Sequence, residues 1–172
     1  MGIAGGCLLL IYGALAIAFP HPAIVEPAFE AFWAVLNLGM IAGILGWTAL
    51  DVARSRRVAR IGASVAVAGH VLRILASILI IAVPSVDPEP LILSSIGLMY
   101  AGLVTLGVTT LRGRRLTGWR AGCPFLVVAT GFVTAAVYQV DLVIHFVLLG
   151  LLWGPAWLLL SGVVRNVAAR PS

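Results

Sequence analysis

The sequence predicts an all-α membrane protein, a polytopic bundle of six transmembrane helices arranged as three hairpins, with both termini in the cytoplasm. The first observation is composition, since 62% of the 172 residues are hydrophobic and only 10% are charged. A water-soluble domain of this size has too little interior for that much apolar surface. The second is that the apolar residues form continuous runs of about the 17–25 residues that a membrane-spanning helix needs. The third is that arginines and acids occupy alternate connecting segments.

The apolar runs define the expected elements. They favour helices over a β-barrel, whose strands alternate apolar and polar residues. All of them belong to one transmembrane domain, 1–172, with no room for a separate soluble catalytic domain. The first run stops at Pro20 and lacks the basic start of a signal peptide, so we expect a retained helix. If it lies at the interface instead, five spans remain. The predicted spans are residues 3–19, 28–50, 58–83, 91–111, 121–138 and 142–164.

Prolines and aromatic residues mark the ends of these spans. The second span begins near Pro27, because proline at a first helical position followed by an acid is a typical helix start. The third ends before Pro84–Pro90, a segment rich in proline and acid. Pro155 removes a backbone hydrogen bond and should kink the sixth span. Trp153 and Trp157, one turn apart in its last third, are expected to face lipid as an aromatic belt near the cytoplasm. The alternative is that they line a cavity, where they could stack on a ligand or stabilise a cation.

The basic residues set the expected orientation. All 11 are arginines, and the lack of lysine excludes a retinal Schiff base, a pyridoxal lysine and a phosphate-binding P-loop. A pI near 10.2 does not indicate nucleic acid here, because the arginines lie in short loops between spans, where they set topology. We expect a multi-pass protein of the cell (plasma or bacterial inner) membrane, with the lipid bilayer as partner. Asp51, three residues before Arg54, should form a boundary ion pair.

Two weaker patterns concern packing. Leu45–Leu50 and Leu106–Leu111 share a Leu-Gly-x-Thr-x-Leu sequence, and each precedes a group of arginines. Duplication of a hairpin and a shared hairpin composition explain this equally well. Gly62, Ala66 and Gly69 on the third span are small residues of the kind that allow close helix packing in membranes.

Polar residues inside the spans gather in the half of the bundle away from the arginine loops. Arg73 lies about ten residues from the outer end of its span. An arginine near mid-membrane costs about 2.5–3.5 kcal/mol on insertion scales, so it should face the bundle and be paired with an acid. We expect a polar cavity that opens away from the cytoplasm. Its polar residues are Glu30, Asn37, His70, Arg73, Asp141 and His145, with Trp33 and Tyr138 beside them.

Ionisable groups inside a membrane indicate a functional site. One hypothesis is an enzyme that uses acid–base chemistry on an apolar, isoprenoid-like small molecule entering from lipid. Glu30 or Asp141 would be the acid and His70 or His145 the base. With one acid on an early helix and one on a late helix, the pattern loosely resembles the small transmembrane terpene cyclases, which implies protonation of an olefin or epoxide. The candidate catalytic residues are Glu30, Asp141, His70 and His145, and the candidate substrate-binding residues are Trp33, Asn37, Arg73 and Tyr138.

Other functions stay open at this point. The charges could form only a buried ion pair that fixes helix register. A small transporter or channel subunit would use Arg73 and the acids to move protons or an anionic solute, and would need a homo-oligomer. An accessory or scaffold protein would dock a partner protein without catalysis. We expect no cofactor and no metal, because the histidines and acids lack a metal-binding spacing, and no nucleic acid.

Overall fold

The computed structural model describes residues 26–83, 85–138, 140 and 142–169, together with Cys7 and Ile11. Within these residues the chain is helical and contains no strand. It has five helical segments long and apolar enough to cross a membrane, which are the features of a membrane protein. The predicted span 3–19 falls almost wholly outside the described residues, so the total of six spans and the side on which the termini lie stay predictions.

The predicted segments 28–50, 58–83 and 91–111 each correspond to one helix. Segment 121–138 covers the end of a short 3₁₀ helix and the α-helix that follows it, and the last segment is a run of three connected helical pieces. Apolar composition sets the middle of each helix, and prolines, glycines and charges set the ends. In order, the elements are α2 (Glu26–Ala49), α3 (Arg56–Ala82), α4 (Glu89–Gly113), the 3₁₀ helix η1 (Gly118–Gly122), α5 (Cys123–Tyr138), α6 (Leu142–Leu148), the π-helical turn η2 (Leu149–Trp153) and α7 (Gly154–Ala168).

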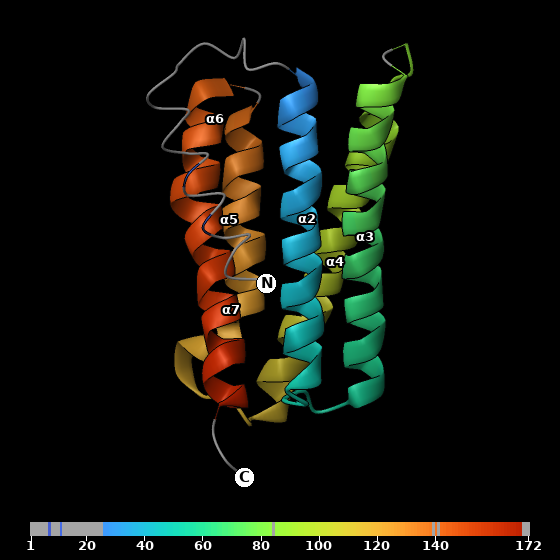
Figure 1. Ribbon diagram of the computed structural model, residues 1–172. Helices are drawn as coiled ribbons and strands as arrows, with labels where there is room; N and C mark the ends of the chain where they lie inside the picture. The colour runs from blue at the N-terminus through green and yellow to red at the C-terminus, as the bar shows by residue number, and fades with distance from the viewer. Residues whose placement is uncertain are drawn as a thin grey trace.

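The helices run alternately in opposite directions and close into a ring (Figure 1). In this ring α2 packs on α3, α3 on α4, α4 on α5, α5 on the run α6–η2–α7, and α7 back on α2. The α2–α3 and α4–α5 connections and the end of α7 therefore share one end of the bundle (Figure 1). We call it the arginine end, because every described arginine except Arg73 lies in these connections or the helical turns beside them.

The two arginine-bearing connections are bonded to each other. Asp51 takes a left-handed backbone conformation (φ 53°) just after α2, which turns the chain toward α3. The backbone N–H of Arg54 donates to the carbonyl of Thr109 (3.0 Å), and Arg115 donates to the carbonyl of Asp51 (2.8 Å). The Asp51 carboxylate forms ion pairs with Arg56 and Arg115. The boundary role expected for Asp51 is confirmed, but its predicted partner Arg54 is wrong, because the backbone of Arg54 is held against α4.

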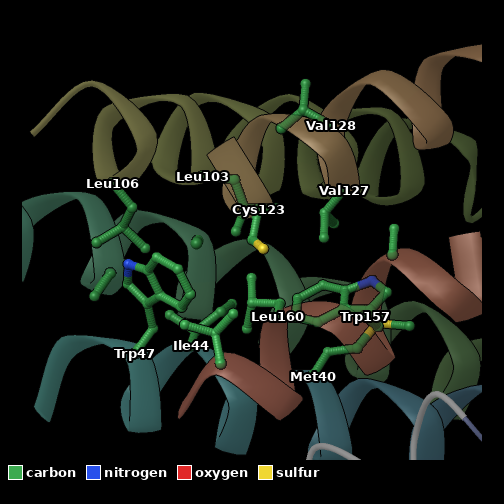
Figure 2. Packing of buried hydrophobic residues seen from close by; sticks show 14 of the residues in the cluster. Met40, Ile44, Trp47, Leu103, Leu106, Cys123, Val127, Val128, Trp157 and Leu160 are labelled. Atoms are coloured by element: carbon green, nitrogen blue, oxygen red, sulfur yellow. The ribbon is translucent and has the colours of Figure 1, made fainter. Parts of the chain in front are cut away.

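The core lies along the axis of the ring. Figure 2 shows side chains from α2, α4, α5 and α7 meeting there, among them Trp47, Leu106 and Trp157. The indole N–H of Trp47 donates to the hydroxyl of Thr110 (3.1 Å), so the two Leu-Gly-x-Thr-x-Leu segments touch each other. Large apolar side chains also cover the outside of the ring, as expected of helices that face lipid.

Small residues let α3 and α4 approach very closely. A Cβ atom built on Gly102 would lie 2.5 Å from the carbonyl oxygen of Gly62, and one built on Gly69 would lie 2.6 Å from the backbone nitrogen of Met99. Side chains at these glycines would collide with backbone, which cannot swing away. The predicted packing role of Gly62, Ala66 and Gly69 is confirmed, since all three are buried on α3.

The predicted distortion at Pro155 takes the form of a π-helical turn, η2, directly before α7. Proline has no N–H, and its ring collides with the carbonyl four residues earlier in a regular α-helix. A wider turn removes the need for that hydrogen bond. The π-helical turn brings Trp153 and Trp157 to the side of the helix that faces the bundle, where both are buried.

Candidate functional site

A buried ion pair between α2 and α3 forms the first part of the site. The guanidinium of Arg73 donates to both carboxylate oxygens of Glu30, from Nη1 at 3.0 Å and from Nη2 at 3.2 Å. Both residues are 7% exposed. Ser77, one turn after Arg73, accepts a hydrogen bond from Nη1 (2.8 Å) and donates to Glu30 (2.7 Å). The prediction that Arg73 faces the bundle and is paired with an acid is confirmed.

An aromatic ring covers this ion pair. The Cζ atom of Arg73 lies 5.7 Å from the ring centroid of Trp33, within the range of a cation–π interaction. Trp33 is one turn after Glu30 on α2, as the spacing predicted. The two hydrogen bonds between Arg73 and Glu30 stabilise charges that would be costly in the apolar part of a membrane. The hydroxyl of Ser77 and the ring of Trp33 contribute to the same stabilisation.

His70 and Asn37 form the second part of the site, about one turn closer to the arginine end. The Nδ1 atom of His70 lies 2.7 Å from Oδ1 of Asn37. The amide nitrogen of Asn37 donates to the carbonyl of Trp33 (2.8 Å), which fixes the amide so that its oxygen faces the histidine. An amide oxygen only accepts, so Nδ1 carries the hydrogen. In the neutral ring, Nε2 then holds a free lone pair.

Three buried polar atoms on α3 and α7 have no hydrogen-bond partner among the described residues. They are Nε2 of His70, Nε1 of Trp157 and the hydroxyl of Ser161. The rings of His70 and Trp157 meet edge to face, with centroids 5.8 Å apart. His70 is 0% exposed and Trp157 1%. Because buried polar groups in proteins are nearly always hydrogen-bonded, the unpaired Nε2 of His70 beside the ring of Trp157, whose N–H is also unpaired, makes this contact a candidate ligand site.

The tryptophans of the last transmembrane segment are inside the bundle, and the prediction of a lipid-facing belt is wrong. The indole N–H of Trp153 donates to the carbonyl of Val127 on α5 (3.1 Å). The ring of Trp157 packs against Gly43 of α2, where a Cβ atom would lie 3.5 Å from it. Space at a glycine and a buried hydrogen bond outweigh the preference of tryptophan for the interface. The ring of Trp153 contacts two other tryptophan rings. Its centroid lies 6.0 Å from that of Trp33 and 6.3 Å from that of Trp157.

His145 sits at a different contact. Its Nδ1 lies 2.6 Å from the carbonyl oxygen of Thr134, to which it donates, so this histidine is bound to α5. Asp141 and the side chain of Tyr138 lie outside the described residues. The structure therefore brings together Glu30, Trp33, Asn37, His70 and Arg73, whereas the roles predicted for Asp141 and Tyr138 stay predictions.

Sequence reasoning missed Ser77 and Ser161, and it placed Trp157 on the surface that faces lipid. Ser77 follows Arg73 at the i+4 spacing of one helical face, so its place beside the ion pair could have been inferred from spacing. Trp157 and Ser161 share the same spacing on α7. Nothing in the sequence pairs that face of α7 with His70 of α3, because the contact depends on how the ring of helices closes.

A cavity of about 230 Å³ lies at the other end of the bundle. It is bordered by the Trp47–Thr110 contact and by Asp51 and Arg56, far along α2 and α3 from the Glu30–Arg73 pair. The outward-opening cavity expected beside that pair stays a prediction.

Comparison of the chain with protein-family models, with curated proteins and with solved structures finds no match. The likeness to small transmembrane terpene cyclases therefore stays an expectation from the pattern of acids. The functional argument depends on the residues described above.

Proposed function

We propose that the protein is a membrane enzyme that performs acid–base chemistry on an apolar, isoprenoid-like substrate, with His70 as the base. The observation that supports this most is the environment of His70 Nε2: it is buried, unpaired among the described residues and next to Trp157. A neutral imidazole nitrogen with a free lone pair is the usual general base of enzymes. Asn37 holds the opposite nitrogen, which fixes the tautomer and orients the ring.

The proposed reaction is an isomerisation or ring closure that conserves all atoms. An acid protonates an olefin or epoxide, positive charge develops on a substrate carbon, and Nε2 of His70 removes a proton to leave a new double bond. The faces of Trp33, Trp153 and Trp157 would stabilise the positive charge through cation–π attraction. No oxidant, reductant or cofactor is required, because one proton enters and one leaves.

The carboxylates have different proposed roles. Glu30 accepts hydrogen bonds from Arg73 and Ser77, an arrangement that suits a charged carboxylate. We assign to this pair a fixed electrostatic and positioning role. Asp141, four residues before His145 in the sequence, is the proposed acid. Removal of the Glu30 carboxylate would leave the Arg73 charge unbalanced beside the substrate.

The proposed setting is the cell membrane, with the arginine end in the cytoplasm and six spans in total. Cytoplasmic loops of membrane proteins carry an excess of arginine, and the arginine-bearing connections share one end of the bundle. The ion pair and His70 would then lie in the non-cytoplasmic half, where a lipid-soluble substrate arrives from the bilayer rather than from water.

The test compares His70→Gln with the control Trp47→Phe. Glutamine keeps a donor for Asn37 but has no basic nitrogen, and Trp47→Phe loses a buried hydrogen bond at the other end of the bundle. Purified protein in liposomes would be supplied with isoprenoid olefins and epoxides, and the products identified by mass spectrometry. We expect turnover to fall at least 100-fold in His70→Gln, since general-base catalysis contributes about 10²–10⁴-fold. Trp47→Phe should keep turnover within a few-fold of wild type.

A second readout does not need a substrate. The second readout is the NMR spectrum of ¹⁵N-histidine-labelled protein at neutral pH. We expect the His70 signals to show a hydrogen on Nδ1 and an unprotonated Nε2. Full turnover by His70→Gln, or a spectrum with the hydrogen on Nε2, would contradict the proposal.

A further inference from the structure

A groove on the outer surface of α3, at the arginine end, lies apart from the site described above. The groove is open, and its volume is about 730 Å³. Its basic wall comes from the first turns of α3, and its apolar floor comes from the turns that follow. The lining residues are Arg56, Arg57, Arg60, Ile61, Ser64 and Val65. We propose that this groove binds an anionic phospholipid, with the phosphate on Arg57 and Arg60 and an acyl chain along Ile61 and Val65.

Two of the three arginines that line the groove are free to hold a phosphate. Arg57 and Arg60 are exposed, and neither forms an ion pair with a described carboxylate. Arg56, by contrast, is bound to Asp51. A spacing of three residues places Arg57 and Arg60 on one face of the helix, one turn apart, where two guanidinium groups can reach the same phosphate. They also lie in the first two turns of α3, where the helix dipole favours an anion.

The rest of the groove fits an acyl chain. Ile61 and Val65 follow Arg57 at successive i+4 positions, and Ser64 follows Arg60 in the same way. Ile61 is 54% exposed on the surface that faces away from the bundle. Val65 lies about 12 Å deeper than Arg57 at 1.5 Å per residue, so the groove runs from headgroup depth toward the hydrocarbon core. A ligand with both a phosphate and a chain matches this order of charge and apolar surface.

Attraction to an anionic lipid would apply to any exposed arginine at this end of the bundle. Arginines outside the groove therefore serve as the control. Arg54 and Arg112 are also exposed and form no ion pair with a described carboxylate, but neither lines the groove. If the arginines acted only as a diffuse positive rim, the loss of either pair would weaken lipid binding equally. The proposal requires that Arg57 and Arg60 matter more.

The experiment measures phospholipid bound to the purified full chain by native mass spectrometry. Delipidated protein would be titrated with phosphatidylglycerol or phosphatidylcholine for wild type, Arg57→Gln/Arg60→Gln and Arg54→Gln/Arg112→Gln. We expect wild type to bind phosphatidylglycerol more tightly. An arginine near an anionic headgroup contributes about fivefold in affinity, so the groove pair should lose about thirtyfold. The control pair should lose less than about fivefold.

A second comparison tests the acyl-chain part of the groove. Ser64→Phe fills the groove without changing charge, and Ile78→Phe places the same ring on an exposed position farther along α3. We expect only Ser64→Phe to weaken phosphatidylglycerol binding, and millimolar inorganic phosphate to leave the bound lipid in place. Equal losses in the two arginine pairs, no effect of Ser64→Phe, or displacement by phosphate would each overturn the proposal.

Discussion

The Glu30–Arg73 pair illustrates what a buried charge needs in a membrane helix. The guanidinium donates to both carboxylate oxygens and to Ser77, and Trp33 covers it. The attraction between the two charges mostly offsets the cost of removing them from water, so the pair as a whole contributes little net stability. Loss of one partner is different, because the remaining charge stays buried without compensation.

This asymmetry predicts a strong coupling between the two residues. Glu30→Gln and Arg73→Met should each lower the free energy of unfolding by about 3–5 kcal/mol. The double variant should be less destabilised than the sum of the two, by about 2 kcal/mol or more. Reversible unfolding in mixed detergent micelles measures this cycle. Glu89→Gln, at an exposed acid in the first turn of α4, serves as the control and should change stability little. Additive effects of the two buried substitutions would contradict the prediction.

The same residues mark how far the site can be predicted from sequence. Arg73 required an acidic partner, and few acids lie at its depth, so the choice could be narrowed to Glu30 and Asp141 in advance. The tryptophans could not be placed, because an indole is stable both at a membrane interface and in a core with space for it. Gly43 lies against the ring of Trp157, and this contact exists only after α2 and α7 pack together.

At the scale of elements, the close contact of α3 and α4 depends on glycine. Gly102→Ala should lower the free energy of unfolding by about 1–3 kcal/mol, because the added methyl group meets backbone atoms of Gly62 and Ala66. Gly97→Ala on the same helix is the matched control, since a Cβ atom there meets nothing within 4 Å. That substitution should be neutral or stabilise by up to about 1 kcal/mol. Equal destabilisation by both, in the unfolding assay used for the ion pair, would exclude this account of the contact.

The link between α2 and α3 gives a pH-dependent prediction. Hydrogen bonds from Arg56 hold the pKa of Asp51 below its ordinary value of 3.8. A carboxyl with a lowered folded-state pKa contributes stability above its unfolded pKa and loses it as the pH falls through the folded value. Asp51→Asn keeps a residue type that tolerates the left-handed backbone (φ 53°) but removes the charge.

The variant should therefore melt at a lower temperature than wild type at pH 7, by no more than about 3 °C, because exposed ion pairs are weak. The difference should shrink as the pH falls below about 4, where the carboxyl of the unfolded chain binds a proton, and should vanish once the pH passes below the lower pKa of the folded state. Thermal melts of both proteins across this pH range measure the effect. A difference that stays constant down to pH 3 would show that charge is not its cause.

The helices themselves were predictable because length and hydropathy largely determine a membrane span. The π-helical turn at Leu149–Trp153 was predicted only as an unspecified kink. Proline excludes a regular hydrogen bond at that point, but the sequence does not say whether the helix bends or takes in an extra residue. That choice depends on the packing of α7 against α2 and α5.

At the scale of the whole molecule, the distribution of charge gives the bundle two different ends. The connections at one end are rich in arginine. The α3–α4 connection lies at the other end, and its charged residues are all acidic. Because the helices alternate in direction, finding the side of the membrane on which one connection lies would fix the orientation of every described helix. The excess of arginine in the cytoplasmic loops of membrane proteins predicts that the arginine end faces the cytoplasm.

Cysteine labelling in intact cells tests this assignment and the undescribed first span together. In a chain with Cys7→Ala and Cys123→Ala, Ser85→Cys lies in the α3–α4 connection and Thr117→Cys in the α4–α5 connection, both at exposed positions. A membrane-impermeant maleimide should label Ser85→Cys in intact cells and Thr117→Cys only after lysis. If residues 3–19 cross the membrane, Gly2→Cys should be protected as Thr117→Cys is, because a sixth span returns the N-terminus to the arginine end. Labelling of Thr117→Cys before lysis would invert the topology and place the His70 site in the cytoplasmic half.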